Sequence, residues 1–410
     1  MTPPAISLYL SFAIPYPQDN SMLRTIRNLI VNIMAAFIRD RDARHKFRNK
    51  YKIRSKFRKL RDDNRRLFHE NKILIAKLNR LQSDYDRLNT KGLFRITHGI
   101  VTSHKNFLSI PDITNRYKKL IRGLDDESIE CVDKILGIMS LISQQDLGPN
   151  KSAVGWVDIF TEDEKKQLDE LNKNFKQRIV TLGDGCFAYK NYILPVKWFL
   201  SNVFYYKQEM HKLNHLERFS NKDIIDVGGC IADSAIVFTE YTSGKVYTFE
   251  PTTQNYDLML KTIELNECKN IIPVKMGLGS KDEKLYINMK NYEKNRGANK
   301  ITKDQLIPEN PDDYEHISIT TLDNYVKGKD LDIGLIKVDI EGFEQEFLKG
   351  AEQTIKKYKP TMLLSIYHNS SDFFDIKPIV ESWDLGYSFK ISRSVYGFLT
   401  AETMLICEQP

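Results

Sequence analysis

The stretch that most constrains the fold runs from residue 222 to residue 251, with the sequence KDIIDVGGCIADSAIVFTEYTSGKVYTFEP. A short apolar run ends at Asp226, two glycines break the chain, and a helix-forming segment leads to a second apolar run that stops at Glu250. This order predicts two parallel strands joined by a crossover helix. The glycine turn then lies at the carboxyl end of the first strand, where free helix N–H groups and a close backbone approach make a nucleotide-sized site.

Two cofactors fit this turn, and its glycines and acids help to separate them. A dinucleotide fingerprint needs G-x-G-x-x-G, whereas the run from Gly228 is G-G-C-I-A-D. Asp226 and Asp233 would repel a pyrophosphate but suit a ligand with a positive amino group. The turn therefore favours S-adenosylmethionine over NAD, and a glycine turn without a ligand is the remaining alternative. Glu250, which follows Asp226 by 24 residues, can accept hydrogen bonds from ribose hydroxyls.

From residue 221 onward, strands and helices are expected to alternate. Strands are predicted at 271–275, 284–289, 335–338 and 362–367, and helices at 255–265, from about 318–325, at 344–358 and at 373–383. Segments 387–391 and 398–407 are predicted to pair antiparallel at the carboxyl end. The predicted fold class is α/β, a doubly wound Rossmann-like sheet with helices on both faces and an antiparallel C-terminal hairpin.

Ligands of such sheets bind outside the carboxyl ends of the strands, near the point where the strand order reverses. The residues that end the buried strands are therefore the candidate site residues. On the predicted cofactor side these are Asp226, Gly228, Gly229, Asp233, Glu250, Met276 and Gly277, and beyond them lie Asp339 and His368.

Four segments of this half closely resemble the FkbM-type methyltransferases, a class I family that depends on S-adenosylmethionine. They are IIDVGGCIADSAIVF, VYTFEP, VKMGLGS and LIKVDIEGFEQEFLKGAEQTIKKYKPTMLLSIYH. The resemblance covers roughly residues 190–407, and its most specific element is the K-x-D-x-E-G-x-E run from Lys337 to Glu344. It implies a class I methyltransferase fold and methylation of a hydroxyl, often on a sugar or polyketide.

The resemblance also assigns roles to single residues. It implies that Asp226, Gly228 and Glu250 bind the cofactor and that Asp339 lies beside the reacting methyl group. Family members commonly carry D-V-G-A-N-x-G-x in the first motif, whereas this chain has Cys230 in place of the asparagine and Ala232 in place of the glycine.

Methyl transfer to a hydroxyl makes two demands on the site. It is an in-line displacement, so alignment supplies most of the acceleration. An alcohol keeps its proton at neutral pH, so a positioned base adds roughly 10²–10⁴-fold. Asp339 and His368 are the candidate catalytic residues; alternatively, Asp339 binds the cofactor's amino group or a cation and His368 is a capping residue of a loop. No H-x-x-x-H or D-x-D signature falls on these positions, so no metal ligand is assigned.

The basic character of the chain comes from one arm. Of the net charge of +7, residues 39–66 contribute +10, with 14 Lys or Arg against 4 Asp or Glu, so the rest of the chain carries 7 − 10 = −3. Residues 22–38 place apolar side chains on one helical face. This combination predicts peripheral contact of residues 22–66 with an anionic membrane, or else a helix packed on its own protein. Nucleic acid is less favoured because no reader motif accompanies the charge.

Residues 53–88 follow a heptad pattern. Isoleucine or leucine occupies one position without a miss, from Ile53 to Leu88, and asparagine occurs twice at the position that pairs with it. This pattern predicts a parallel two-stranded coiled coil and therefore a homodimer. A single amphipathic helix lying on the body is the alternative.

The predicted organisation has four parts: an amphipathic segment (1–38), a basic and heptad coiled-coil arm (39–90), a mostly helical cap or substrate region (105–220) and an S-adenosylmethionine-binding domain (221–410). Thr161 followed by Glu164 predicts a capping box in the third part. The five cysteines are scattered, which indicates a reducing compartment, and no apolar run approaches the length of a membrane span. We expect a cytoplasmic protein, peripheral to the cytoplasmic membrane.

The expected function is O-methylation of a saccharide hydroxyl in surface-glycan or related biosynthesis. One alternative is a methyltransferase-fold scaffold that dimerises at the membrane and is catalytically impaired by its altered first motif. The other is a nucleic-acid methyltransferase that uses the basic arm. No N-P-P-[YF] tetrapeptide follows the strand that ends before Asp339, which counts against that alternative.

Overall fold

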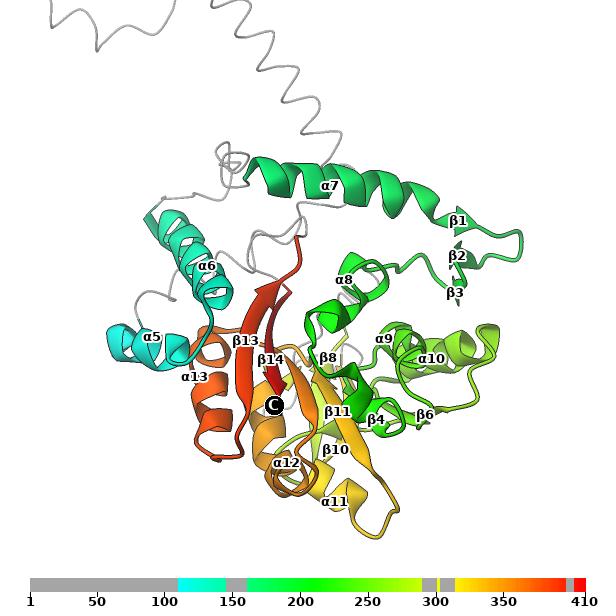
Figure 1. Cartoon of the computed structure of the whole chain (residues 1–410). Helices are drawn as coiled ribbons and strands as arrows, with labels where there is room; N and C mark the ends of the chain where they lie inside the picture. The colour runs from blue at the N-terminus through cyan, green and yellow to red at the C-terminus, as the bar shows by residue number, and fades with distance from the viewer. Residues whose placement is uncertain (1–109, 145–160, 290–300, 303–313, 396–401) are drawn as a thin grey trace, which may run out of the picture. The chain divides into compact units, whose positions relative to one another are not determined.

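The computed structural model describes residues 110–144, 161–289, 301–302, 314–395 and 402–410 (Figure 1). The predicted amphipathic segment, basic arm and coiled coil lie outside these residues. The helices are α5 (Ile113–Ile121), α6 (Asp126–Gln144), α7 (Glu162–Asn174), α8 (Ser201–Phe204), α9 (Asp233–Phe238), α10 (Thr253–Leu265), α11 (Leu322–Val326), α12 (Glu344–Tyr358) and α13 (Ser370–Glu381), with 3-10 turns η4 (Lys176–Arg178), η5 (Lys207–Lys212) and η6 (Leu216–Phe219).

Strands make three sheets. They are β1 (Val180–Thr181), β2 (Phe187–Tyr189), β3 (Tyr192–Leu194), β4 (Asp223–Val227), β5 (Val246–Phe249), β6 (Ile271–Val274), β7 (Gly277–Leu278), β8 (Glu283–Asn288), β9 (Ile301–Thr302), β10 (Tyr314–Thr320), β11 (Ile333–Val338), β12 (Thr361–Ser365), β13 (Ser388–Arg393) and β14 (Thr403–Glu408). The largest sheet has the order β13-β14-β12-β11-β4-β5-β6.

This seven-stranded sheet is mainly parallel. The pairs β4–β5, β5–β6, β4–β11 and β11–β12 are all parallel, and β14 runs antiparallel to both β12 and β13. From β4 the chain proceeds outward through β5 and β6, and then returns to the other side of β4 with β11 and β12. The reversal of strand order at β4 and β11 is where an open α/β sheet binds its ligands. The predicted α/β fold is confirmed.

Helices cover both faces of this sheet, as the alternation of side chains along each strand requires. Ile225 and Ile336 belong to the apolar core that includes the buried side chains of α12 and α13. Their neighbours Ile224 and Leu335 belong to a second core with α8, α9 and Met259 of α10. Figure 1 shows α9 and α10 well separated from α11, α12 and α13.

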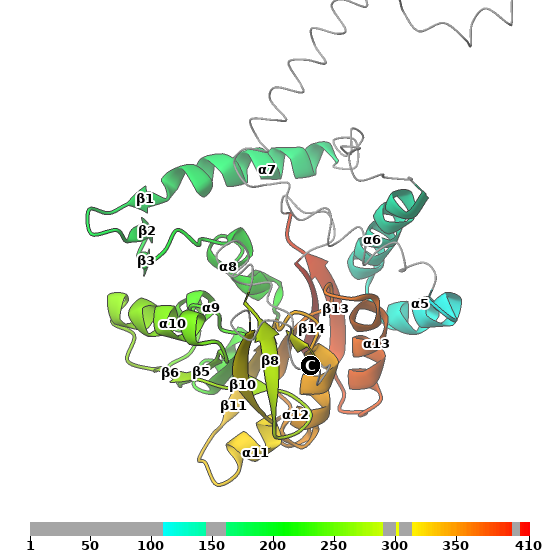
Figure 2. The same cartoon turned by 180° about the vertical axis from the view of Figure 1, so that it is seen from behind.

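A separate four-stranded sheet, β7-β10-β8-β9, corrects two expectations. The strand predicted at 284–289 is β8, which pairs with β10 and β9 and not with the parallel sheet; Figure 2 brings β8 and β10 to the front. Residues 318–320 end β10 and do not begin a helix. The helix begins only at Leu322, after Thr321, whose side chain accepts a hydrogen bond from the N–H of Asn324.

Residues 110–219 combine helices with a small sheet. The capping box predicted at Thr161 and Glu164 is present at the start of α7. The three-stranded sheet β1-β2-β3 was not predicted, because its strands are only two or three residues long. Helix α5 contacts α13, and α6 contacts β13. Among the described residues, no helix is both long and apolar enough to cross a bilayer.

Candidate active site at the ends of β4, β5, β11 and β12

The turn after β4 is held against the two neighbouring strands. The backbone N–H groups of Gly228 and Gly229 both donate to the carbonyl oxygen of Phe249, at 3.1 and 2.9 Å. A Cβ atom at Gly228 would overlap the carbonyl oxygen of Asp339, and one at Gly229 would overlap Oγ1 of Thr248. Glycine is therefore required at both positions, because the backbone approaches β5 and the end of β11 too closely for any side chain.

Asp226 holds this turn from the inside. Its side chain is fully buried, and its Oδ2 accepts hydrogen bonds of 2.8 Å from Ser234 Oγ and from Thr248 Oγ1. Its Oδ1 lies 3.3 Å from Nζ of Lys337, which also donates to the carbonyl oxygen of Gly228 at 2.9 Å. Burial lowers the pKa of Lys337, but Asp226, Asp339 and Asp233 together raise it above its ordinary value, so the lysine stays charged. Asp226 therefore shapes the predicted cofactor site and exposes no surface of its own to a ligand.

Every second residue of the turn has a left-handed backbone. The φ angles are 79° at Gly228, 46° at Cys230 and 65° at Ala232. A residue with a Cβ atom pays about 1–2 kcal/mol for this conformation. The chain thus keeps a backbone path suited to glycine while it carries Cys230 and Ala232, and the departure from the family motif does not abolish the turn.

Two buried carboxyl groups flank the turn. Glu250 follows β5, and its Oε1 accepts from the N–H and the hydroxyl of Thr252 at 2.8 and 2.6 Å. Asp233 begins α9, and its Oδ1 accepts from the N–H of Ser234 at 3.0 Å. Burial raises the pKa of each carboxyl group to about 7. A ligand that brings hydrogen-bond donors or a positive charge would stabilise the ionised forms.

Met276 and Gly277 lie in the link between β6 and β7. A Cβ atom on Gly277 would lie 3.6 Å from the Pro251 ring and closer still to Ile319. Since Pro251 follows Glu250 directly, this link borders the segment that carries Glu250, the residue predicted to bind the ribose. Met276 is half-buried. The structure thus brings the predicted residues of β4, β5 and β6 to one edge of the sheet.

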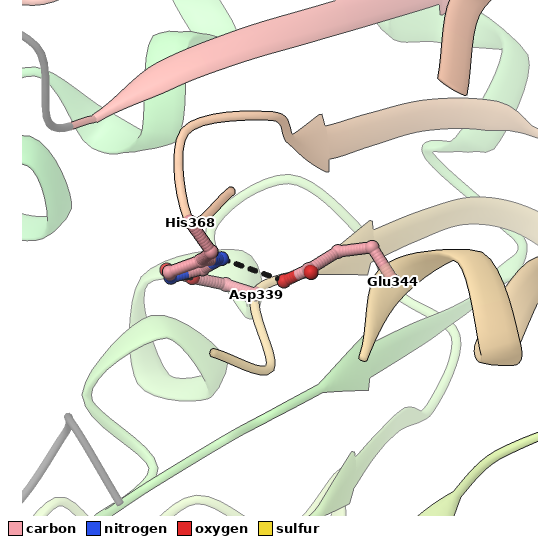
Figure 3. Close-up of side chains that lie close together, drawn as sticks. All are labelled: Asp339, Glu344 and His368. Carbon is pink, nitrogen blue, oxygen red and sulfur yellow. Dashed lines mark ion pairs between the residues drawn. The ribbon is translucent and has the colours of Figure 1, made fainter. Parts of the chain in front are cut away.

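The two predicted catalytic residues lie together in a second group, the acidic cluster, formed by Asp339, Glu341, Glu344 and His368. The imidazole is 4% exposed; its Nε2 lies 3.3 Å from Asp339 Oδ1 and 3.8 Å from Glu341 Oε2, and its Nδ1 lies 2.8 Å from Glu344 Oε1 (Figure 3). The hydroxyl of Tyr367 donates to Asp339 Oδ1 at 3.3 Å. The residues come from the end of β11, the start of α12 and the loop after β12.

The carboxylates control the protonation of His368. Burial lowers the pKa of the imidazole, but Glu344, Glu341 and Asp339 together raise it to about 10. Burial likewise raises the pKa of Glu344, and His368 holds it below its ordinary value. At neutral pH the imidazole is therefore a cation that cannot accept a proton. Of the two predicted catalytic residues, Asp339 is the one whose chemistry suits a base.

Comparison with known proteins agrees with this geometry. Residues 226–389 match the family model described as the methyltransferase FkbM domain. The likeness to this family thus covers residues 226–389, called the FkbM domain from here on. The match begins at Asp226 and contains β5, β11, the acidic cluster and β12, so it includes all the predicted site residues. The resemblance found in the sequence is confirmed, and with it S-adenosylmethionine as the cofactor on which this family depends.

Solved methyltransferases match parts of the chain at low identity. The FkbM methyltransferase of Methylobacillus flagellatus is 16% identical, with 74% of this chain and 61% of that protein covered and a TM-score of 0.47. An rRNA methylase from Streptococcus thermophilus is 13% identical, with 47% and 90% covered and a TM-score of 0.29. TYW2 of M. jannaschii, solved with AdoMet, is 14% identical, with 56% and 83% covered and a TM-score of 0.29.

These likenesses do not bear on substrate or mechanism, because both the identities and the TM-scores are low. The chain spans 61% of the length of the FkbM methyltransferase from Methylobacillus flagellatus. No curated protein sequence matches the chain.

The FkbM domain has a site whose chemistry fits S-adenosylmethionine. The close-packed glycine turn lies at the carboxyl end of β4, and the buried carboxyl groups of Glu250 and Asp233 have raised pKa values, so further donors would stabilise their ionised forms. Ribose hydroxyls and the ammonium group of the cofactor are such donors. Glu250 and Asp233 are therefore the residues best suited to hold it.

Sequence reasoning missed two residues near the candidate site. Lys337 was noticed only as part of a motif, although a lysine inside the apolar strand Ile333–Val338 signals a buried counter-ion. Glu402 carried no signal at all. It precedes β14, accepts from Asn202 Nδ2 at 2.5 Å, and has a pKa raised to about 8 by burial and by Asp339.

Proposed function

We propose that this protein is an S-adenosylmethionine-dependent O-methyltransferase that methylates a hydroxyl of a saccharide in surface-glycan or related biosynthesis. One observation carries the proposal: the carbonyl oxygen of Asp339 borders Gly228 so closely that no Cβ atom fits between them. The side chain suited to act as a base therefore belongs to a residue packed against the cofactor turn. The saccharide is proposed from the resemblance to the family.

The residues divide the work as follows. When bound, S-adenosylmethionine supplies a methyl group on a sulfonium, so that a C–O bond forms as the C–S bond breaks and its electron pair stays on sulfur. Glu250 and Asp233 hold the cofactor's donors. Asp339 receives the proton of the hydroxyl, for which a positioned base contributes roughly 10²–10⁴-fold. His368, as a cation 3.3 Å from Asp339 Oδ1, orients that carboxylate.

Calorimetric titration and a transfer assay test this function. We expect the full chain to bind S-adenosylmethionine and its demethylated product, and Glu250→Ala to weaken both. Asp339→Asn should lower turnover strongly without loss of folding. Glycan extracts incubated with isotope-labelled cofactor should gain one labelled methyl group. Absence of cofactor binding at millimolar ligand would refute the proposal.

A second candidate is a catalytically impaired scaffold with the same fold. The left-handed Cys230 and Ala232 favour it, because both occupy positions at which family members commonly carry other residues. It predicts an intact fold and cofactor-independent dimerisation without turnover. Restoring the family residues with Cys230→Asn and Ala232→Gly should then raise activity from undetectable to measurable.

We further propose that the chain forms a homodimer through residues 53–88 and meets the cytoplasmic face of a membrane through residues 22–66. The heptad and the basic arm support this. Light scattering tests the first part: Leu67→Lys with Leu74→Lys should convert the full chain to a monomer. Flotation with anionic vesicles tests the second; recovery of all protein in the soluble fraction would contradict it.

A further inference from the structure

The acidic cluster has the geometry of a cation site. One carboxylate oxygen of Asp339, one of Glu344 and one ring nitrogen of His368 all lie within 4.8 Å of one another (Figure 3). Bonds from a divalent metal to oxygen or nitrogen are about 2.0–2.3 Å long, so two ligands of one ion lie at most about 4.6 Å apart. The three atoms are therefore within a few tenths of an ångström of ligand spacing.

The buried side chains of the cluster are paired almost entirely with one another. Both ring nitrogens of His368 make ion pairs, Nδ1 2.8 Å from Glu344 Oε1 and Nε2 3.3 Å from Asp339 Oδ1, and neither makes a further hydrogen bond within the described part of the chain. The second oxygen of Glu344, whose side chain is 1% exposed, accepts no hydrogen bond from a described donor, and Glu344 also interacts with the carboxyl group of Asp372. A buried oxygen without a donor costs about 1–3 kcal/mol. Figure 3 shows the imidazole and the Glu344 carboxylate pointing towards each other.

The acidic cluster also has more negative than positive charge, which a bound cation would balance. The carboxylates of Asp339, Glu341 and Glu344 all approach one imidazole, so even a protonated ring leaves an excess of negative charge. The nearby Lys337 is occupied by Asp226 and by the carbonyl oxygen of Gly228. Buried charges persist when they are paired or when they bind metals.

We propose that Asp339, Glu344 and His368 bind one divalent transition-metal ion. Carboxylates suit hard cations such as Mn²⁺, whereas imidazole suits borderline metals, and Mn²⁺ accepts both. Each residue gives one ligand atom, and the ion takes the place of the proton that His368 carries in its absence, because only a neutral imidazole binds a metal. The second oxygen of Asp339 stays free to receive a proton. The part the ion plays rests on the proposed function: a cation beside the acceptor hydroxyl lowers the hydroxyl's pKa.

Titration of the full chain with Mn²⁺ alone tests the site. The signal of free Mn²⁺ in electron paramagnetic resonance should fall with a stoichiometry of one ion per chain. Asp339→Asn and His368→Gln should weaken binding by about 10- to 100-fold or more. Glu352→Gln is the matched control, because it removes a carboxylate from the same helix about 12 Å further along and should leave binding unchanged. Thermal melts confirm that each variant is folded.

Pulsed resonance adds a readout that depends on the ligand itself. Bound Mn²⁺ should show coupling to one imidazole nitrogen, and this coupling should vanish in His368→Gln. No stoichiometric binding, or binding that none of the three ligands affects, would overturn the inference. Calorimetry with S-adenosylmethionine in the absence of metal tests the proposed function separately, so Mn²⁺ binding without methyl transfer would support the metal site and refute the activity.

Discussion

The glycine turn after β4 and the acidic cluster beyond β11 are built in opposite ways. The turn is made of backbone contacts and of buried side chains that satisfy one another, as with Asp226 and Lys337. The acidic cluster is made mainly of side chains, and its carboxylates outnumber its cations. The region predicted to bind the cofactor is thus preorganised, whereas the acidic cluster carries an excess of negative charge that a further cation would balance.

The two regions nevertheless meet on one strand. Lys337, near the end of β11, ties down the turn, and Asp339, two residues later, enters the acidic cluster. The close contact between Gly228 and the Asp339 carbonyl oxygen joins them directly. Substitutions that act on this junction should therefore have larger effects than those within either region.

Lys337→Met should have the largest effect, because it leaves the fully buried carboxylate of Asp226 without a counter-ion. Breaking a buried pair by removing one partner costs about 3–5 kcal/mol. Urea denaturation should show a loss of this size, together with loss of cofactor binding. The double variant with Asp226→Asn should recover part of the stability, and the exposed Lys349→Met should cost little.

Gly228→Ala comes next and tests the junction itself. The left-handed φ of 79° costs about 1–2 kcal/mol, and overlap with the Asp339 carbonyl oxygen adds about 1–3 kcal/mol. Gly328→Ala is a matched control, since its φ is 74° but no atom lies within 4 Å of the added Cβ. Equal losses of unfolding free energy in the two variants would show that the backbone at the junction can move to accommodate a Cβ atom.

Glu250 should make stability depend on pH. Its pKa is raised to about 7 in the folded protein by burial, above the ordinary value near 4.3 in the unfolded chain, so the folded state binds the proton more tightly. The tighter proton binding by Glu250 adds to the free energy of unfolding, and this gain is complete below about pH 4.3. It is lost as the pH rises through about 7, and it amounts to about 1.4 kcal/mol for each unit by which the pKa is raised.

Glu250→Gln should therefore flatten the fall in unfolding free energy between pH 5 and pH 8. Asp233, whose pKa is also raised to about 7, should keep part of the slope. Denaturation curves across this range make the measurement, and the exposed Glu264→Gln on α10 is the control. A slope identical to that of the original chain would show that Glu250 ionises freely.

Ala232→Gly should have the smallest effect on stability, and unlike the other variants it should increase stability. Relief of the left-handed φ of 65° should stabilise the protein by roughly 1 kcal/mol, less what glycine loses in conformational entropy. Ala235→Gly, inside α9, should instead destabilise it. Thermal melts distinguish the two, and a loss of stability in Ala232→Gly would mean that the turn tolerates Ala232 without strain.

Much of the fold was predictable because its signals are local. The apolar run, glycines and second run between residues 222 and 251 predicted β4, the turn and β5, and Thr161 with Glu164 predicted the start of α7. Sheet membership was not predictable in the same way. The strand propensity around residue 284 is real, but nothing in it distinguishes the parallel sheet from the small sheet in which β8 pairs with β10.

The sequence by itself determined the strand–turn–helix unit, the family and the cofactor, since each depends on residues close together in the chain. Only the tertiary structure decided that Asp226 points inward to Lys337, that His368 is charged, and that Glu402 has a pKa shifted by Asp339. Burial and charge set these properties, and both depend on side chains that meet only when distant strands pair.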